Sequence, residues 1–311
     1  MSNTTFEFPI AGPDGYVAEP CVPDVNEMTF LTTDDGVDYV QTPDSAFANL
    51  AEAGYPWEPN YVKVDGMRMH YIDVSPDDTS SSNGDEIVLM LHGQPTWSFL
   101  YRKMVPVLVE RGFRVICPDM LGMGRSDKPL EMMEHTYSKH VERIKSFIRQ
   151  VIPDALGEPT ITLFVQDWGS LIGLRVVGDE PSWFRRVISA NGHFPVLPRG
   201  IRPFDVSNPV NYNCSDTRTF LDMSMERMTS SPCSMTDQNC FGIWIYFALT
   251  NPSWLPSDVV QLASFKNLTN ATLEHYNAPY STRPHHTAAM RTLPSMIAGI
   301  VEPEFGNTAA W

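Results

Sequence analysis

Residues Ile161–Gly173 read ITLFVQDWGSLIG and contain the strongest structural signal of the sequence. Its first part, Ile161–Val165, is a run of β-branched and apolar residues that is typical of a short buried strand. The run stops at Gln166, and a helical pattern follows as far as Val177. A polar residue at a strand-to-helix corner, with glycine just after it, is the pattern of a nucleophile elbow. The sequence therefore predicts a sharp strand–turn–helix unit with Asp167 at its apex.

The sequence pattern is compatible with two roles for Asp167. A carboxylate is already ionised at pH 7 and needs no base to become a nucleophile, which favours displacement at an sp³ carbon. The same side chain at the start of a helix also fits an N-cap, whose oxygen accepts a hydrogen bond from the backbone of the first turn. The elbow stretch alone leaves both interpretations open.

Length and composition limit the classes of function. A chain of 311 residues can form one large core, or a core with an inserted domain. Its 37 acidic and 22 basic residues give a formal charge of −15, which argues against nucleic acid or an anionic membrane as partner. The five cysteines show no CxxC, so we expect neither a disulfide framework nor a zinc site. No cofactor and no metal are expected. The first residues lack a signal-peptide pattern, so a cytoplasmic protein is expected.

The pattern around the elbow predicts a doubly covered sheet. Strands are predicted at Glu86–Leu91, Arg114–Cys117 and Arg186–Ala190, and helices at Ser98–Phe113 and Ser138–Ile152. Alternation of nearly continuous apolar strands with helices indicates an α/β fold with a mostly parallel sheet and helices on both faces.

Three polar residues follow predicted strand ends. Ligands of such sheets bind beyond the carboxyl ends of the strands. Gln94, Asp167 and His193 each come just after a strand, so we expect them to face one crevice.

Four segments are expected along the chain. Residues 1–40 lack a sustained period and are predicted to form an irregular N-terminal extension. Residues 41–194 form the core, which includes a β-hairpin turning at Asp65-Gly66. Residues 195–297, rich in Met, Asn, Ser and Pro, are predicted to form a helical cap, and residues 298–311 begin a return to the core.

Three motifs carry a family resemblance. They are HGQPTWSFLYRKM at His92–Met104, PDMLGMGRSDKP at Pro118–Pro129 and VQDWG at Val165–Gly169. Together they resemble the haloalkane dehalogenases, which have the α/β-hydrolase fold with an inserted helical cap. The similarity runs from about Thr42 to the end. It is closest to the subfamily that binds halide with two tryptophans.

The resemblance implies roles for four residues. Asp167 would attack the halogen-bearing carbon of a small halogenated alkane, and water would hydrolyse the resulting ester. The indole N–H groups of Trp168 and Trp244 would bind the departing halide. The backbone N–H groups of Gln94 and Trp168 would form the oxyanion hole. The other interpretation of Trp244 is a core aromatic residue of a cap helix.

The general base is the point at which this chain departs from the family pattern. Family members carry the base histidine and its acid on strands after the cap, whereas this sequence ends at Trp311. We therefore expect a truncated, catalytically incomplete enzyme, with His193 as a weak substitute base. His92 and Trp97 are expected to be structural, and Gln94 stands where some relatives have Glu.

Two other functions are compatible with the pattern. An epoxide hydrolase would use Asp167 with a cap tyrosine, for which Tyr212, Tyr246 and Tyr276 are candidates; the paired tryptophans argue against it. A non-catalytic binding protein on a decayed hydrolase fold is the third possibility.

Overall fold

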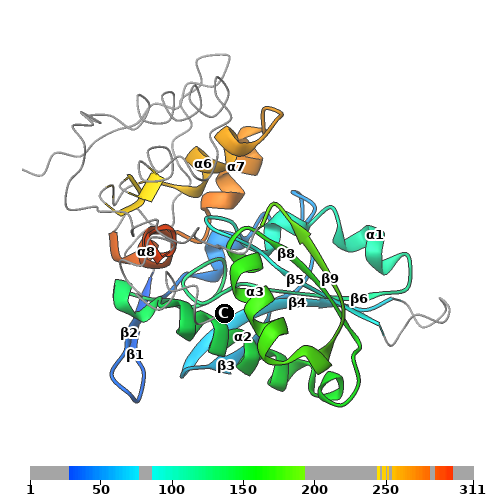
Figure 1. Cartoon of the computed structure of the whole chain (residues 1–311). Helices are drawn as coiled ribbons and strands as arrows, with labels where there is room; N and C mark the ends of the chain where they lie inside the picture. The colour runs from blue at the N-terminus through cyan, green and yellow to red at the C-terminus, as the bar shows by residue number, and fades with distance from the viewer. Residues whose placement is uncertain are drawn as a thin grey trace, which may run out of the picture.

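A six-stranded sheet forms the centre of the protein. The computed structural model describes residues 28–76, 86–192, 244–245, 247–249, 251, 254–280 and 284–296. The sheet has the order β3-β4-β6-β5-β8-β9 (Figure 1). Its strands are β3 (Asn60–Val64), β4 (Met67–Val74), β5 (Ile87–Leu91), β6 (Arg114–Pro118), β8 (Ile161–Gln166) and β9 (Phe184–Ala190). The last four of these are mutually parallel, and β4 runs antiparallel to both of its neighbours, β3 and β6. The predicted mostly parallel sheet is therefore confirmed.

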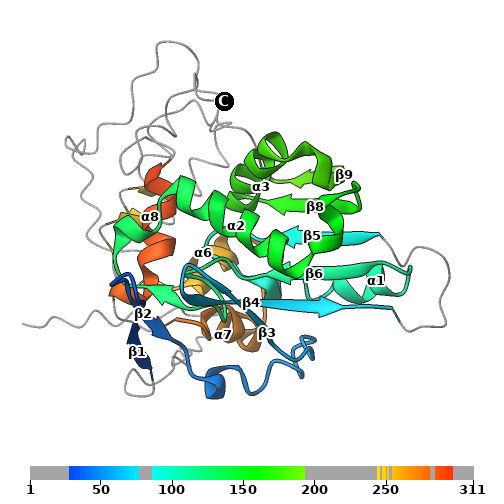
Figure 2. The ribbon, with the colours of Figure 1, turned by 90° about the horizontal axis from the view of Figure 1, so that it is seen from below.

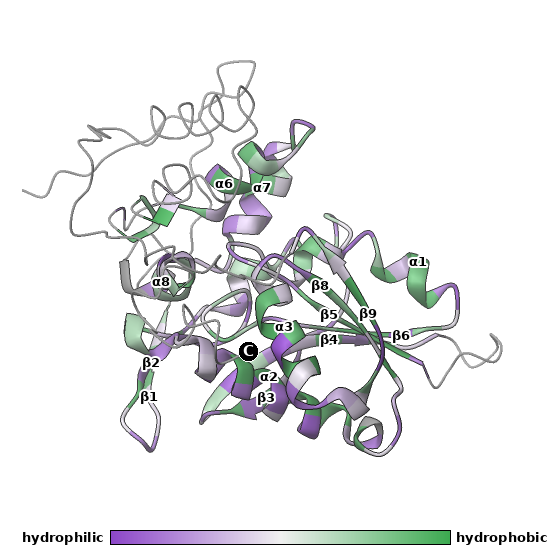
Figure 3. Cartoon of the chain, viewed as in Figure 1, coloured by the Kyte–Doolittle hydropathy of each residue, from purple (hydrophilic) through white to green (hydrophobic). Residues whose placement is uncertain are grey.

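Both faces of the sheet are buried at its central strands β5, β6 and β8, whereas the edge strand β9 is largely exposed. Successive residues of a strand point to opposite faces, so a strand covered on both sides must be apolar throughout. In β5, Leu89 and Leu91 join the hydrophobic cluster that contains α2 (Tyr137–Val151) and α3 (Trp168–Asp179). Val88 and Met90 join a second cluster with α1 (Val105–Val109). Figure 2 draws α2 and α3 in front of the sheet and α1 behind it, and Figure 3 shows the hydrophobic colouring of β5 and β8.

The predicted helix over Ser98–Phe113 is wrong as a single element. The chain instead forms a 3-10 turn at Ser98–Tyr101 and then the short α1. Pro106, at the start of α1, has no N–H to continue a hydrogen-bond ladder from the preceding turn. The sequence also predicts that the apolar residues Leu100, Met104, Val107 and Leu108 form one inward face, and this is wrong because Met104 and Val107 are 36% and 47% exposed.

The expectation of an irregular segment up to residue 40 is wrong for its described part. Strands β1 (Thr29–Thr32) and β2 (Asp38–Gln41) form an antiparallel hairpin, and β2 also pairs with β7 (Lys128–Pro129). Val40 is fully buried and pairs with Lys128, which ties the hairpin to the glycine-rich loop after β6 (residues 119–127). Residues 1–27 lie outside the described residues.

Part of the expected cap is described and includes three α-helices with assigned bounds. They are α6 (Pro256–Ala263), α7 (Asn270–Asn277) and α8 (Ala288–Met296). The side chain of Gln94, at the carboxyl end of β5, donates a hydrogen bond to the Met290 carbonyl, which places α8 beside that end of the sheet. Across the described ranges, no helix is long and apolar enough to cross a membrane. The boundaries predicted for the cap stay a prediction.

Candidate active site

Asp167 occupies a strained corner between β8 and α3. Its backbone has φ 52° and ψ −124°, a conformation that costs a non-glycine residue about 1–3 kcal/mol. The Asp167 carbonyl accepts a hydrogen bond from the Ser170 N–H at 2.8 Å and so starts α3. Asp167 is the residue that precedes α3, but its side chain does not make the usual capping hydrogen bond to the second or third N–H of the helix, so capping does not account for this carboxylate. The predicted strand–turn–helix unit is confirmed, and its carboxylate is available for another purpose.

Two glycines let the ends of β5 and β8 approach each other. A Cβ atom added at Gly93 would lie 2.3 Å from the Asp167 Cβ. One added at Gly169 would lie 2.2 Å from the Leu91 carbonyl oxygen. No side chain fits at these distances. The glycines of the HG and DWG motifs are therefore required for the corner to pack against the end of β5.

Two backbone N–H groups bind the Asp167 carboxylate. The Gln94 N–H donates to Asp167 Oδ1 at 2.8 Å, and the Trp168 N–H also bonds the carboxylate. Burial raises the pKa of Asp167 to about 6, and the two N–H bonds act in the opposite direction. With that pKa, the ionised form prevails at pH 7 by about ten to one. The group is therefore a carboxylate that is poorly solvated and still charged.

His92 is neutral and holds the loop beside Asp167. Its Nε2 accepts a hydrogen bond from the Met120 N–H at 3.0 Å, so that nitrogen carries no proton. The proton is then on Nδ1, which donates to the Gly93 carbonyl at 2.9 Å. Burial lowers the pKa of His92, which favours this neutral form. Both ring nitrogens are occupied, as the structural role predicted from the sequence requires.

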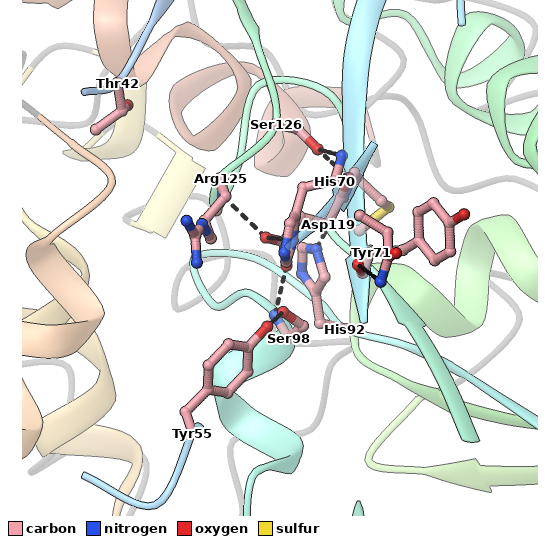
Figure 4. Close-up of polar contacts among 12 residues, drawn as sticks. Thr42, Tyr55, His70, Tyr71, His92, Ser98, Asp119, Arg125 and Ser126 are labelled. Carbon is pink, nitrogen blue, oxygen red and sulfur yellow. Dashed lines mark hydrogen bonds and ion pairs between the residues drawn. The ribbon is translucent and has the colours of Figure 1, made fainter. Parts of the chain in front are cut away.

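A second buried carboxylate, Asp119, organises the loop that follows β6 (Figure 4). It accepts hydrogen bonds from the Ser98 N–H at 2.7 Å, the Arg125 N–H at 2.8 Å and His70 Nδ1 at 2.7 Å. Burial alone would raise the pKa of Asp119, but His70, His92 and the Ser98 N–H hold it at about 2. Sequence reasoning missed this group. The signal was an acidic residue directly after a buried strand, followed by a glycine-rich turn.

The two predicted halide-binding tryptophans border one hydrophobic cluster. Trp168, the first residue of α3, is 3% exposed and belongs to the main cluster. Trp244 is half-buried and packs against the same cluster. Its ring stacks on Phe247 with centroids 5.9 Å apart and meets Trp254 edge-on at 5.5 Å. Both residues therefore contact the main cluster, and their shared binding of halide stays a prediction.

Other predicted residues lie elsewhere. Trp97 is fully buried in the second cluster and stacks on Phe99 at 5.3 Å. Tyr276, a candidate for an epoxide hydrolase, packs edge-on against the same Phe99. It is therefore not in the cluster that contains Trp168. The substitute base His193 and the candidates Tyr212 and Tyr246 lie outside the described residues.

A metal site finds no support in the part of the chain that the structure describes. Within it, no three His, Cys, Asp or Glu side chains are grouped so as to hold a metal ion. Cys117, the cysteine on β6, is a buried free thiol, and burial raises its pKa well above the usual value.

Comparisons with known proteins agree with this geometry. The alpha/beta hydrolase fold family matches residues 86–212. A haloalkane dehalogenase of Mycobacterium marinum is 36% identical over 284 residues, which cover 88% of this chain and 78% of that protein. A haloalkane dehalogenase of Psychrobacter cryohalolentis is 33% identical over 279 residues, covering 88% of this chain and 76% of that protein.

Solved structures show the same fold. The tetrameric structure of haloalkane dehalogenase DpaA from Paraglaciecola agarilytica matches with a TM-score of 0.60 at 24% identity, covering 86% of this chain and 76% of that one. The fold, the buried aspartate at the elbow and the sequence identity to dehalogenases over most of the chain all indicate the same family. The chain belongs to the haloalkane dehalogenase family of the α/β-hydrolase fold.

Proposed function

We propose that this protein cleaves the carbon–halogen bond of a small halogenated alkane through an ester of Asp167. The observation that carries the proposal is the Asp167 carboxylate, ionised in a poorly solvated position and bound by the Gln94 N–H. An ionised carboxylate displaces halide from an sp³ carbon without proton transfer, so it suits this reaction and needs no base for the first step.

In the first step a carboxylate oxygen of Asp167 forms a bond to carbon while the carbon–halogen bond breaks. The electron pair of that bond leaves with the halide, and the negative charge moves from the carboxylate to the halide. Trp168 and Trp244 are the proposed donors that bind this charge through their indole N–H groups. Donors that bind charge developing in the transition state lower the barrier, most effectively where water is excluded.

In the second step water attacks the carbonyl carbon of the ester, and the carbonyl oxygen becomes an oxyanion. When the oxyanion collapses, the bond from that carbon to the alkyl-bearing oxygen breaks, the alkyl group leaves as an alcohol, and the Asp167 carboxylate is restored. The N–H groups of Gln94 and Trp168 already bind the Asp167 carboxylate, so they are in place to stabilise that oxyanion. This step also requires a base that takes a proton from water.

The core histidines do not suit the role of that base. Burial lowers the pKa of His70, His92, His135 and His140, and the structure gives none of the four a hydrogen bond to Asp167. We therefore infer that none of these four histidines activates the water, and we propose that ester hydrolysis is slow compared with the displacement.

Substituting the nucleophile tests the proposal directly. The protein should release about one equivalent of bromide from 1,2-dibromoethane in a fast phase, because one carboxylate accepts one alkyl group. Asp167→Ala should abolish this phase. Asp154→Ala, which removes an exposed carboxylate, is the matched control and should leave it unchanged. Wild-type bromide release by Asp167→Ala would disprove the assignment.

The rate of the fast phase should depend on pH. A pKa of about 6 means that Asp167 is protonated, and not nucleophilic, at lower pH. The rate should therefore rise about tenfold per unit up to pH 6 and level off above it. The raised pKa also means that the folded state retains this proton between about pH 4 and 6. The Asp167 contribution to the free energy of unfolding should therefore fall as pH rises through that window. A rate that stays constant from pH 5 to 8 would contradict the proposal.

Loss of either halide donor should slow the displacement. Trp168→Phe and Trp244→Phe each keep an aromatic ring but remove the indole N–H. On the precedent of oxyanion-hole donors, each should reduce the rate of bromide release by about one to three powers of ten. Trp183→Phe, a buried tryptophan beside Phe184, is the control. An unchanged rate in Trp244→Phe would remove that residue from the proposed halide site.

A further inference from the structure

Helix α8 contains a backbone carbonyl without its usual partner. In an α-helix each carbonyl accepts a hydrogen bond from the N–H four residues later. Four residues after Met290 the residue is Pro294, which lies inside α8 and has no N–H. Met290 is fully buried, so water does not replace the missing donor, and an unpaired buried carbonyl destabilises the folded protein.

The side chain of Gln94 supplies that donor. Its Nε2 donates to the Met290 carbonyl at 2.7 Å, across 196 residues of sequence. Gln94 is 8% exposed, so this contact is sheltered from solvent. The backbone N–H of the same residue binds Asp167 Oδ1 at 2.8 Å. One residue therefore holds the nucleophile with its backbone and α8 with its side chain.

The next residue of α8 extends the connection to the segment that contains Trp244. The Arg291 guanidinium donates to the Leu249 carbonyl at 2.6 Å. Leu249 lies two residues after Phe247, on whose ring the Trp244 indole stacks. On its other side α8 packs closely on the glycine-rich loop, because a Cβ atom at Gly122 would lie 2.5 Å from the Ala289 Cβ. Any shift of α8 would therefore affect both neighbours.

We propose that the Gln94 side chain is a positioning residue, which fixes α8 through the Met290 carbonyl and thereby sets the place of Trp244 relative to Asp167. This inference rests on the proposed function, since it assigns Trp244 to the halide. It also explains why an amide suits position 94. The contact requires a donor, and the carboxylate of a Gln94→Glu variant would only present oxygen lone pairs to another oxygen.

A double-mutant cycle with Pro294 tests the inference. Pro294→Ala restores an N–H that can bond the Met290 carbonyl within α8, so the Gln94 donor becomes redundant. The four proteins are the wild type, Gln94→Met, Pro294→Ala and the double variant. Bromide affinity is measured by quenching of tryptophan fluorescence, and unfolding is followed in urea by circular dichroism.

We expect the loss of bromide affinity caused by Gln94→Met to depend on whether residue 294 is Pro or Ala. Gln94→Met should weaken bromide binding about three- to tenfold in the wild type, the usual effect of a buried hydrogen bond, and less than twofold beside Pro294→Ala. Gln94→Glu should resemble Gln94→Met at neutral pH. Arg291→Met, which cuts the second contact, should also weaken bromide binding. Trp244→Phe lacks the proposed indole donor, so its bromide affinity shows how much binding is lost when that donor is absent.

Several outcomes separate failure of the inference from failure of the proposed function. Normal bromide binding by Gln94→Met, or an equal loss in both backgrounds, would overturn the positioning role and leave the halide site intact. Absence of bromide binding in the wild type would overturn the halide site and the positioning role together. The unfolding measurements would then still show whether Gln94 and Pro294 are coupled, as the hydrogen bond requires.

Discussion

The close approach of β5 and β8 at their carboxyl ends is the constraint on which the site depends. Gly93 and Gly169 have no room for a side chain, and the corner between them forces Asp167 into a positive φ. Such a backbone persists only where the surrounding structure holds it. Here the holding structure is the doubly covered sheet, because clusters of apolar side chains on both faces fix the two strands side by side.

Two buried carboxylates at this end of the sheet are held in opposite ways. Asp119 accepts three hydrogen bonds, one of them from His70, and its pKa lies near 2. Asp167 is bound by two backbone N–H groups without a charged partner, and burial raises its pKa to about 6. A carboxylate whose charge is balanced by hydrogen bonds and a histidine stabilises the loop around it, whereas a poorly solvated carboxylate is more reactive. The local partners therefore separate a structural carboxylate from a proposed nucleophile.

Local sequence patterns were sufficient for the sheet and the elbow. The run Ile161–Val165 predicted β8 because its residues are apolar or β-branched, as in a strand buried on both faces, and the glycine after Trp168 indicated the sharp turn. The same kind of pattern failed at Ser98–Phe113, where Pro106 limits α1 to a short helix. It also failed for the hairpin of β1 and β2, which depends on pairing with the distant β7.

The polar contacts of the site were harder to predict, because they join segments that are far apart in sequence. The bond from Gln94 to the Met290 carbonyl spans 196 residues, and only the fold reveals that Pro294 has freed that carbonyl. The network around Asp119 similarly combines residues from β4, the turn after β5 and the glycine-rich loop. A period of two or 3.6 residues carries no information about such pairs.

The central claim is that Asp167 becomes alkylated. Intact-mass spectrometry after incubation with 1-bromohexane measures this directly. We expect one added hexyl group, which maps to the peptide that contains Asp167 and is missing from Asp167→Ala. A fast multi-turnover release of bromide would show that a base hydrolyses the ester efficiently, contrary to the slow hydrolysis inferred above. If the protein formed no adduct and released no bromide, the assignment of Asp167 as the nucleophile would be contradicted.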